Sequence, residues 1–136
     1  MGVDARHLAR ERALELLYEA ELKGAAPTEV LASLPVAPDP LVVTLVRDAA
    51  ATREVAEAAI AAAATDWPLD RMALIDRLVM VLAVGELLSA TPPPDAVVLD
   101  EAVELAKTYS TDASPRFVNG VLAAVVATLP RPPRTE

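Results

Sequence analysis

The chain has 136 residues, of which 54% are apolar, with a formal net charge of −8 and no cysteine. This apolar content excludes a wholly disordered protein, and the lack of cysteine excludes disulfides and thiolate metal sites. The longest uncharged run, residues 117–130, has 14 residues and is too short to cross a bilayer. The first 22 residues mix charged with apolar side chains, unlike a secretory signal. We expect one cytoplasmic domain without membrane contact.

The charge is unevenly distributed along the chain. Residues 1–12 contain three arginines against two carboxylates, and residues 107–136 contain four basic against two acidic residues. The segment between them contains five basic against sixteen acidic residues. If the two ends meet in the fold, a small basic surface lies on an acidic body. Such a surface favours local contact with a polyanion and makes the binding sensitive to salt.

The first half of the chain predicts three helices. Residues 5–22 place apolar side chains on one face at i, i+4, i+7, i+8 and i+11, namely Ala9, Ala13, Leu16, Leu17 and Ala20. Pro27 opens a short second helix ending near Leu34. Asp39 has the chemistry of an N-cap and is followed by Pro40, so a long alanine-rich helix is predicted to about Ala64.

The second half predicts three more helices. Residues 69–88 are apolar almost all round, which indicates the central buried helix. Asp95 and Ser114 are expected to cap the last two helices. The helix after Asp95 has the inward face Val98, Ala102, Leu105, Ala106 and Tyr109. The helix after Ser114 has the inward face Val118, Val121, Leu122, Val125 and Leu129. The prediction is an all-α protein of six or seven helices in two packed sub-bundles, roughly residues 1–64 and 65–130, followed by a flexible tail, residues 131–136.

Catalytic motifs are missing from this sequence. Its four glycines cannot form a dinucleotide-binding or phosphate-binding loop. The single histidine, His7, excludes the paired-histidine metal motifs and leaves little basis for a serine triad. We therefore expect no enzyme, no cofactor and no metal.

Several charged side chains lie on predicted helices. Asp100, Glu101 and Glu104 form an acidic cluster, best interpreted as a solvated helix face. Glu86 is harder to explain, because it lies in the most apolar helix, where a lone carboxylate needs a partner. An internal hydrogen bond and a contact with another protein are equally compatible with this position.

The two ends of the chain carry candidate binding residues. Arg6 and Arg10 lie 40° apart on the first helix, and His7, Leu14 and Tyr18 follow on the adjoining flank. Near the other end, Phe117, the only phenylalanine, lies in the first turn of the last helix beside Arg116. Such a ring can stack on an unpaired base, although it could equally pack over its own helix.

The segments "ARERALELLYEAEL", "DRLVMVLAVGELL", "DEAVELAK" and "RFVNGVL" give the chain a clear family resemblance. In their order and spacing they resemble the NusB family of bacterial transcription antitermination proteins, over residues 5–129. The resemblance implies an all-α fold of two small helical bundles. It also implies binding to the boxA element of ribosomal RNA operon transcripts, together with ribosomal protein NusE, in the RNA polymerase antitermination complex.

The resemblance also assigns roles to individual residues. Phe117 would stack on a base with Arg116 beside it, and Arg6, His7 and Arg10 would form the basic start that contacts the RNA backbone. Tyr18 and Glu86 would meet NusE. Asn119 would be structural, and Gly120 would allow another helix to approach. These roles require that folding brings the first arginines and Phe117 together in one RNA site.

Some features depart from the family pattern and leave alternatives open. His7 and Leu8 interrupt the basic run, and Asp100 adds a negative charge before EAVELAK, so weaker RNA binding is expected. An acidic adaptor that binds only proteins is the main alternative. A homodimer formed through Leu8 and the flank around Leu14 is another option. A fragment of an RNA methyltransferase is disfavoured, because no cofactor motif is present.

Overall fold

The computed structural model describes residues 2–132, with side chains from residue 5 onward. This part of the chain contains seven α-helices and one 3₁₀ turn, and no strand, so the all-α prediction is confirmed. The elements are α1 (Gly2–Lys23), α2 (Pro27–Ala32), α3 (Pro40–Ala51), α4 (Arg53–Ala63), η1 (Leu69–Arg71), α5 (Leu74–Leu87), α6 (Asp95–Tyr109) and α7 (Ser114–Thr128). None of the helices in residues 2–132 is both long and apolar enough to cross a membrane.

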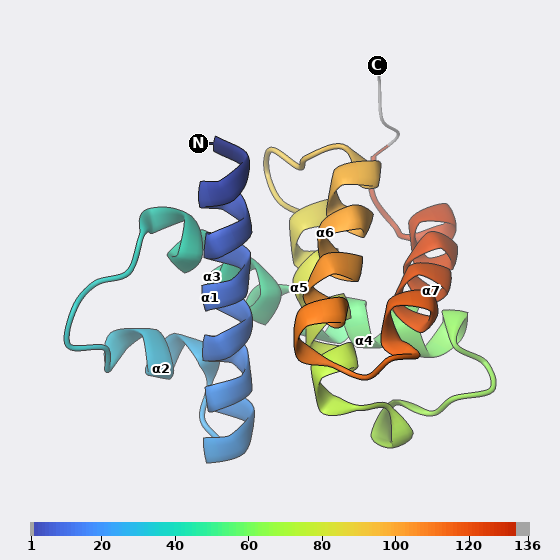
Figure 1. The fold of residues 1–136 in the computed structure, drawn as a ribbon, viewed down its shortest axis with the longest axis horizontal. Helices are drawn as coiled ribbons and strands as arrows, with labels where there is room; N and C mark the ends of the chain where they lie inside the picture. Colours follow the sequence, from blue (N-terminus) through green and yellow to red (C-terminus); the bar gives the residue numbers. More distant parts are fainter. Residues whose placement is uncertain (1, 133–136) are drawn as a thin grey trace.

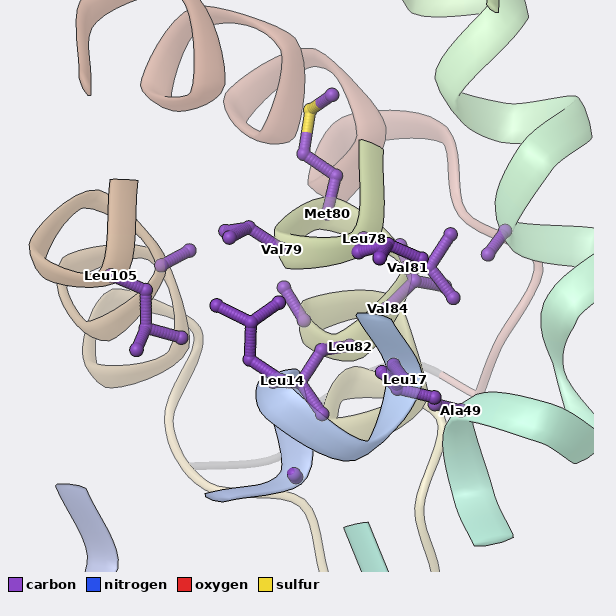
Figure 2. Packing of buried hydrophobic residues seen from close by; sticks show 14 of the residues in the cluster. Leu14, Leu17, Ala49, Leu78, Val79, Met80, Val81, Leu82, Val84 and Leu105 are labelled. Carbon is purple, nitrogen blue, oxygen red and sulfur yellow. The ribbon is translucent and has the colours of Figure 1, made fainter. Parts of the chain in front are cut away.

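Helix α5 lies at the centre of the molecule, as predicted from its apolar sequence. Residues 78–87 are all buried, and α1, α3, α4, α6 and α7 pack around the helix (Figure 1). Figure 2 shows Leu14 and Leu17 of α1, Ala49 of α3 and Leu105 of α6 gathered around the side chains of α5. A helix that is apolar on every side is stable in water only when it is enclosed in this way.

The predicted core faces are largely correct. The five residues predicted for the face of α1 are all buried, and so are the five predicted for the last helix. Two side chains differ from expectation. Tyr109 at the end of α6 is 38% exposed, whereas Leu14 is buried with 2% exposure. The apolar flank around Leu14 is therefore part of the core, and of the residues expected to support self-association Leu8 is the exposed one, at 61%.

The long helix predicted for residues 39–64 is two helices, divided at Thr52. Asp39 caps the first as predicted, accepting a hydrogen bond from the backbone N–H of Leu41 at 2.8 Å. The Thr52 hydroxyl donates to the carbonyl of Asp48 at 2.7 Å. A hydroxyl bonded to the carbonyl four residues earlier weakens and bends a helix. The chain turns there, and α4 packs against α5 and α7.

Three other helix starts differ from the prediction. Residues 69–71 form a 3₁₀ turn, and the extended backbone of Met72 and Ala73 delays α5 until Leu74. Pro94 precedes α6, and the carboxylate of Asp95 instead binds Arg131 through two hydrogen bonds of 2.7 and 3.0 Å. Ala113 precedes α7, and the Ser114 hydroxyl bonds the loop before it. Arg131 is thus held in place, whereas residues 133–136 of the predicted flexible tail lie outside the described part.

The helix contacts suggest where the two sub-bundles meet. Helix α1 packs against α2 and α3, whereas α4 packs against α7, and α5 contacts both groups. The two-bundle division remains a proposal, and the packing favours a boundary near Thr52 over one near residue 64.

A close approach between helices occurs at Gly85 and not at Gly120. A Cβ placed on Gly85 would lie 3.0 Å from the backbone nitrogen of Ala49 and 3.1 Å from its Cα, so α3 crosses α5 at this glycine. A Cβ placed on Gly120 would meet no atom within 4 Å. The expectation that Gly120 allows a helix to approach is therefore wrong, because its open side faces solvent.

Candidate functional site

Arg10 and Glu86 form an ion pair inside the molecule. The guanidinium Nε and Nη2 each donate to a different oxygen of Glu86 at 2.8 Å, and Nη1 donates to Glu101 at 3.4 Å. Arg10 is 4% exposed and Glu86 6% exposed. Burial alone would lower the pKa of Arg10, but the hydrogen bonds and charges of Glu86 and Glu101 outweigh burial and raise it. The cation is therefore permanent and fully engaged.

This geometry corrects the expected position of Arg10 and shows one of the two alternatives left open for Glu86. Arg10 was expected at the surface facing an RNA backbone, but its charged atoms are directed at Glu86 and Glu101. For Glu86, the internal hydrogen bond is what the structure shows, because both of its carboxylate oxygens accept from Arg10. The charge of Arg10 is thus neutralised within the protein, while Glu86 also lines the hollow that contains Arg6.

His7 joins α1 to α6. Its Nδ1 lies 2.9 Å from Glu101 and its Nε2 lies 3.4 Å from Glu11. The hydrogen bond with Glu101 is the main cause that raises the pKa of His7, and burial opposes it. The acidic cluster on α6 is thus only partly a solvated face, since Glu101 is half-buried and binds both His7 and Arg10.

Arg6 is exposed on the first turns of α1. It lines a hollow of about 280 Å³ with Asp48 of α3 and with Ser89, Thr91 and Pro93 of the α5–α6 loop, among others. Burial raises the pKa of Asp48. Within the described part of the chain, Arg6 has no ion-pair partner, so its charge remains available to an anion.

Phe117 and Arg116 occupy the start of α7. Phe117 is half-buried against the core, yet it lines two hollows, of about 490 and 380 Å³. Arg116 is exposed at the smaller one. The start of α7 offers few free backbone N–H groups to a ligand. Pro115 has no N–H, and the backbone N–H groups of Ser114 and Phe117 donate to backbone carbonyls.

The expectation of one RNA site uniting Arg6 and Phe117 is wrong. The two residues line different hollows, with no lining residue in common. In Figure 1, α1 begins at the top of the molecule and α7 begins at the bottom. Helices α1 and α6 run in the same direction (Figure 1), and α7 begins where α6 ends. The start of α7 therefore lies at the opposite end of the molecule from Arg6. A nucleic acid that touches both would have to run along the molecule.

Sequence reasoning missed two functional candidates, Trp67 and Glu101. Trp67 lies in the loop between α4 and η1, lines both hollows at Phe117, and is 49% exposed. A lone tryptophan beside a proline in a polar turn was the signal available for it. Nothing in the sequence distinguished Glu101 from its exposed neighbours. Tyr18, the expected partner contact, is 38% exposed on α1.

Comparisons with known proteins agree with this architecture. The NusB family model matches residues 7–127, and the chain belongs to the NusB family. The transcription antitermination protein NusB of Acidothermus cellulolyticus is 49% identical over 127 residues, which cover 90% of this chain and 88% of that protein.

Two solved structures have the same fold. T. maritima NusB superposes with a TM-score of 0.79 at 26% identity, over 90% of each chain. A structure described as antitermination factors NusB and NusE in complex with dsRNA matches with a TM-score of 0.75 at 26% identity, over 93% of this chain and 98% of that one.

Proposed function

We propose that this chain is a cytoplasmic transcription antitermination factor. It binds boxA-type single-stranded RNA of ribosomal RNA operon transcripts together with ribosomal protein NusE, within the RNA polymerase antitermination complex. It acts by binding and positioning, without catalysis, metal or cofactor. Membership of the NusB family carries this proposal, and the related structure that contains NusE and RNA supports it.

The binding residues divide into two groups under this proposal. Phe117 stacks on an unpaired base and Arg116 holds an adjacent phosphate, because both line the same hollow and Arg116 is exposed. Arg6 attracts the backbone at the other end of the molecule. Base stacking contributes ~1–3 kcal/mol per base, so Phe117 provides the larger share.

Arg10 and His7 have an indirect role in this scheme. Arg10, held by Glu86, fixes the position of α1 against α5 and α6, and His7 adds a second link through Glu101. These contacts keep Arg6 and Tyr18, which α1 carries, at fixed positions relative to α5 and α6. Tyr18 contacts NusE directly, and Glu86 supports that contact from within by holding α1.

The burial of Arg10 favours one alternative function. With Arg10 and His7 engaged by carboxylates, few cations remain on a chain of net charge −8. An acidic adaptor that binds NusE or another protein and has little RNA affinity of its own would have this pattern of charges.

A titration separates the two functions. A labelled boxA-type strand and a scrambled strand of equal length are titrated with the protein, with and without NusE, at two salt concentrations. The proposal predicts tighter binding of the boxA-type strand in the presence of NusE, with a modest loss of affinity at higher salt because few phosphates are neutralised. Equal binding of both strands would support the adaptor.

A further inference from the structure

Trp67, the only tryptophan of the chain, is hydrogen-bonded within its own turn although it is half-exposed. Its indole N–H donates to the carbonyl of Arg71 at 3.1 Å, and its backbone N–H donates to the carbonyl of Ala64 at 3.0 Å. The polar edge of the indole is thereby satisfied within the protein. A ring fixed in this manner loses little conformational entropy when a flat partner stacks on it.

Trp67 and Phe117 together line both hollows at the start of α7. The larger also contains Arg71, Met72 and Ser114, and the smaller also contains Arg116 and Gly120. Gly120 contributes no side chain and is exposed, which keeps the smaller hollow open toward solvent. The two rings thus stand in two adjoining recesses on the same part of the surface.

The charges around the recesses favour an anionic strand. Arg71 and Arg116 are both exposed, one at each recess, and within residues 5–132 neither forms an ion pair. Two carboxylates are also present. Asp66 is exposed at the smaller recess, whereas Asp76 at the larger one is buried and accepts the Ser110 hydroxyl at 2.6 Å. Each recess therefore combines an aromatic pair with an available guanidinium.

We propose that Trp67 and Phe117 form a two-ring platform that binds consecutive unpaired RNA bases, with Arg71 and Arg116 on the flanking phosphates. Stacking on fixed aromatic rings with nearby arginines is how proteins bind single-stranded nucleic acid. This inference rests on the proposed function and adds Trp67 and Arg71 to it. It also implies that the strand extends from α7 toward the loop before η1, away from Arg6.

The single tryptophan allows a direct test, because all tryptophan emission of this chain comes from Trp67, and subtracting the emission of the Trp67→Phe complex removes any contribution from NusE. The boxA-type strand is titrated in the presence of NusE, and binding is followed in parallel by anisotropy of a label on the RNA. A base stacked on Trp67 should quench its emission with the same saturation midpoint as the anisotropy. Trp67→Leu should weaken RNA binding by about five-fold or more, whereas Trp67→Phe, which keeps a ring, should change it by less than about two-fold.

Two controls make the test specific. Tyr109→Leu removes an aromatic ring that is 38% exposed at the end of α6 and lines neither recess, so it should leave the affinity of the NusE complex for RNA unchanged. Thermal unfolding of each Trp67 variant verifies that the fold is retained. If the leucine variant fails to fold, the emission titration of the native protein still tests the platform.

The outcomes distinguish this inference from the proposed function. RNA binding that leaves both the Trp67 emission and the Trp67→Leu affinity unaltered would overturn the platform while the proposed function stands. A change in emission caused by NusE without RNA would mark the recesses as a protein-binding surface and would also overturn it. If the anisotropy shows no RNA binding with or without NusE, the proposed function fails and the platform fails with it.

Discussion

Arg10 of α1 and Glu86 of α5 meet through two parallel hydrogen bonds of 2.8 Å in the interior of the protein. Glu101 of α6 adds a third contact to the same guanidinium. One buried cation thus joins three helices. Taking these charges out of water is costly, so the pair contributes to helix position more than to net stability.

Breaking this pair should strongly destabilise the protein. Arg10→Met leaves Glu86 buried without its cation, and we expect the free energy of unfolding in urea to fall by about 3–5 kcal/mol. The double variant Arg10→Met/Glu86→Leu should recover much of this loss. Arg12→Ala is the matched control, because Arg12 pairs with Glu15 at the surface and its removal should cost about 0.5 kcal/mol or less. Equal losses for Arg10→Met and Arg12→Ala would contradict the buried pair.

Two glycines should respond to alanine in opposite directions. In Gly85→Ala the new methyl group would press on the backbone of Ala49, which cannot easily move, so we expect a loss of about 1–3 kcal/mol. In Gly120→Ala the methyl group has free space, and the better helix propensity of alanine should stabilise the protein by about 0.5–1 kcal/mol. Thermal denaturation of both variants measures the difference. A stabilised Gly85→Ala protein would refute the close crossing of α3 and α5.

His7 should make stability depend on pH. Because Glu101 raises the pKa of His7 in the folded protein, protonated His7 stabilises the fold. This contribution is complete below the unfolded pKa of about 6.5 and is lost as the pH rises through the folded value. The stability advantage of the native protein over His7→Gln should therefore shrink as the pH rises above about 6.5. The charged groups facing His7 are Glu101 and Glu11, with Arg10 beside Glu101. A difference that stays constant with pH would contradict the assignment.

Tyr18 provides a test of the proposed contact with NusE. It is 38% exposed on α1, so its removal should not disturb the core. We expect Tyr18→Ala to weaken binding of NusE by about ten-fold or more, measured by isothermal titration calorimetry, since exposed tyrosines often dominate such contacts. The unfolding temperature should stay close to that of the native protein. Unchanged affinity would place the contact elsewhere.

The sequence predicted the helices and their inward faces because helical periodicity directly records which side is buried. The face of α1, the central position of α5 and the face of α7 all follow from spacing. The break at Thr52 escaped prediction, because a hydroxyl bonded back to Asp48 leaves no clear mark in a run of alanines.

The site was less predictable, because its contacts link distant residues. Arg10 on a polar flank looks like a surface arginine until Glu86, 76 positions later, is brought beside it. The same holds for Glu101 with His7 and for Trp67 with Phe117. Local spacing places a residue on a face, but only the packing of helices determines which face another helix covers.

The most direct test of the proposed function is the affinity of the NusE complex for a boxA-type strand when Phe117 is replaced. If Phe117 stacks on a base, Phe117→Ala should weaken binding by about ten-fold or more, and Phe117→Tyr should retain most of it. If both variants bind the strand as tightly as the native protein, Phe117 is only a core-edge residue and the proposed RNA site is wrong.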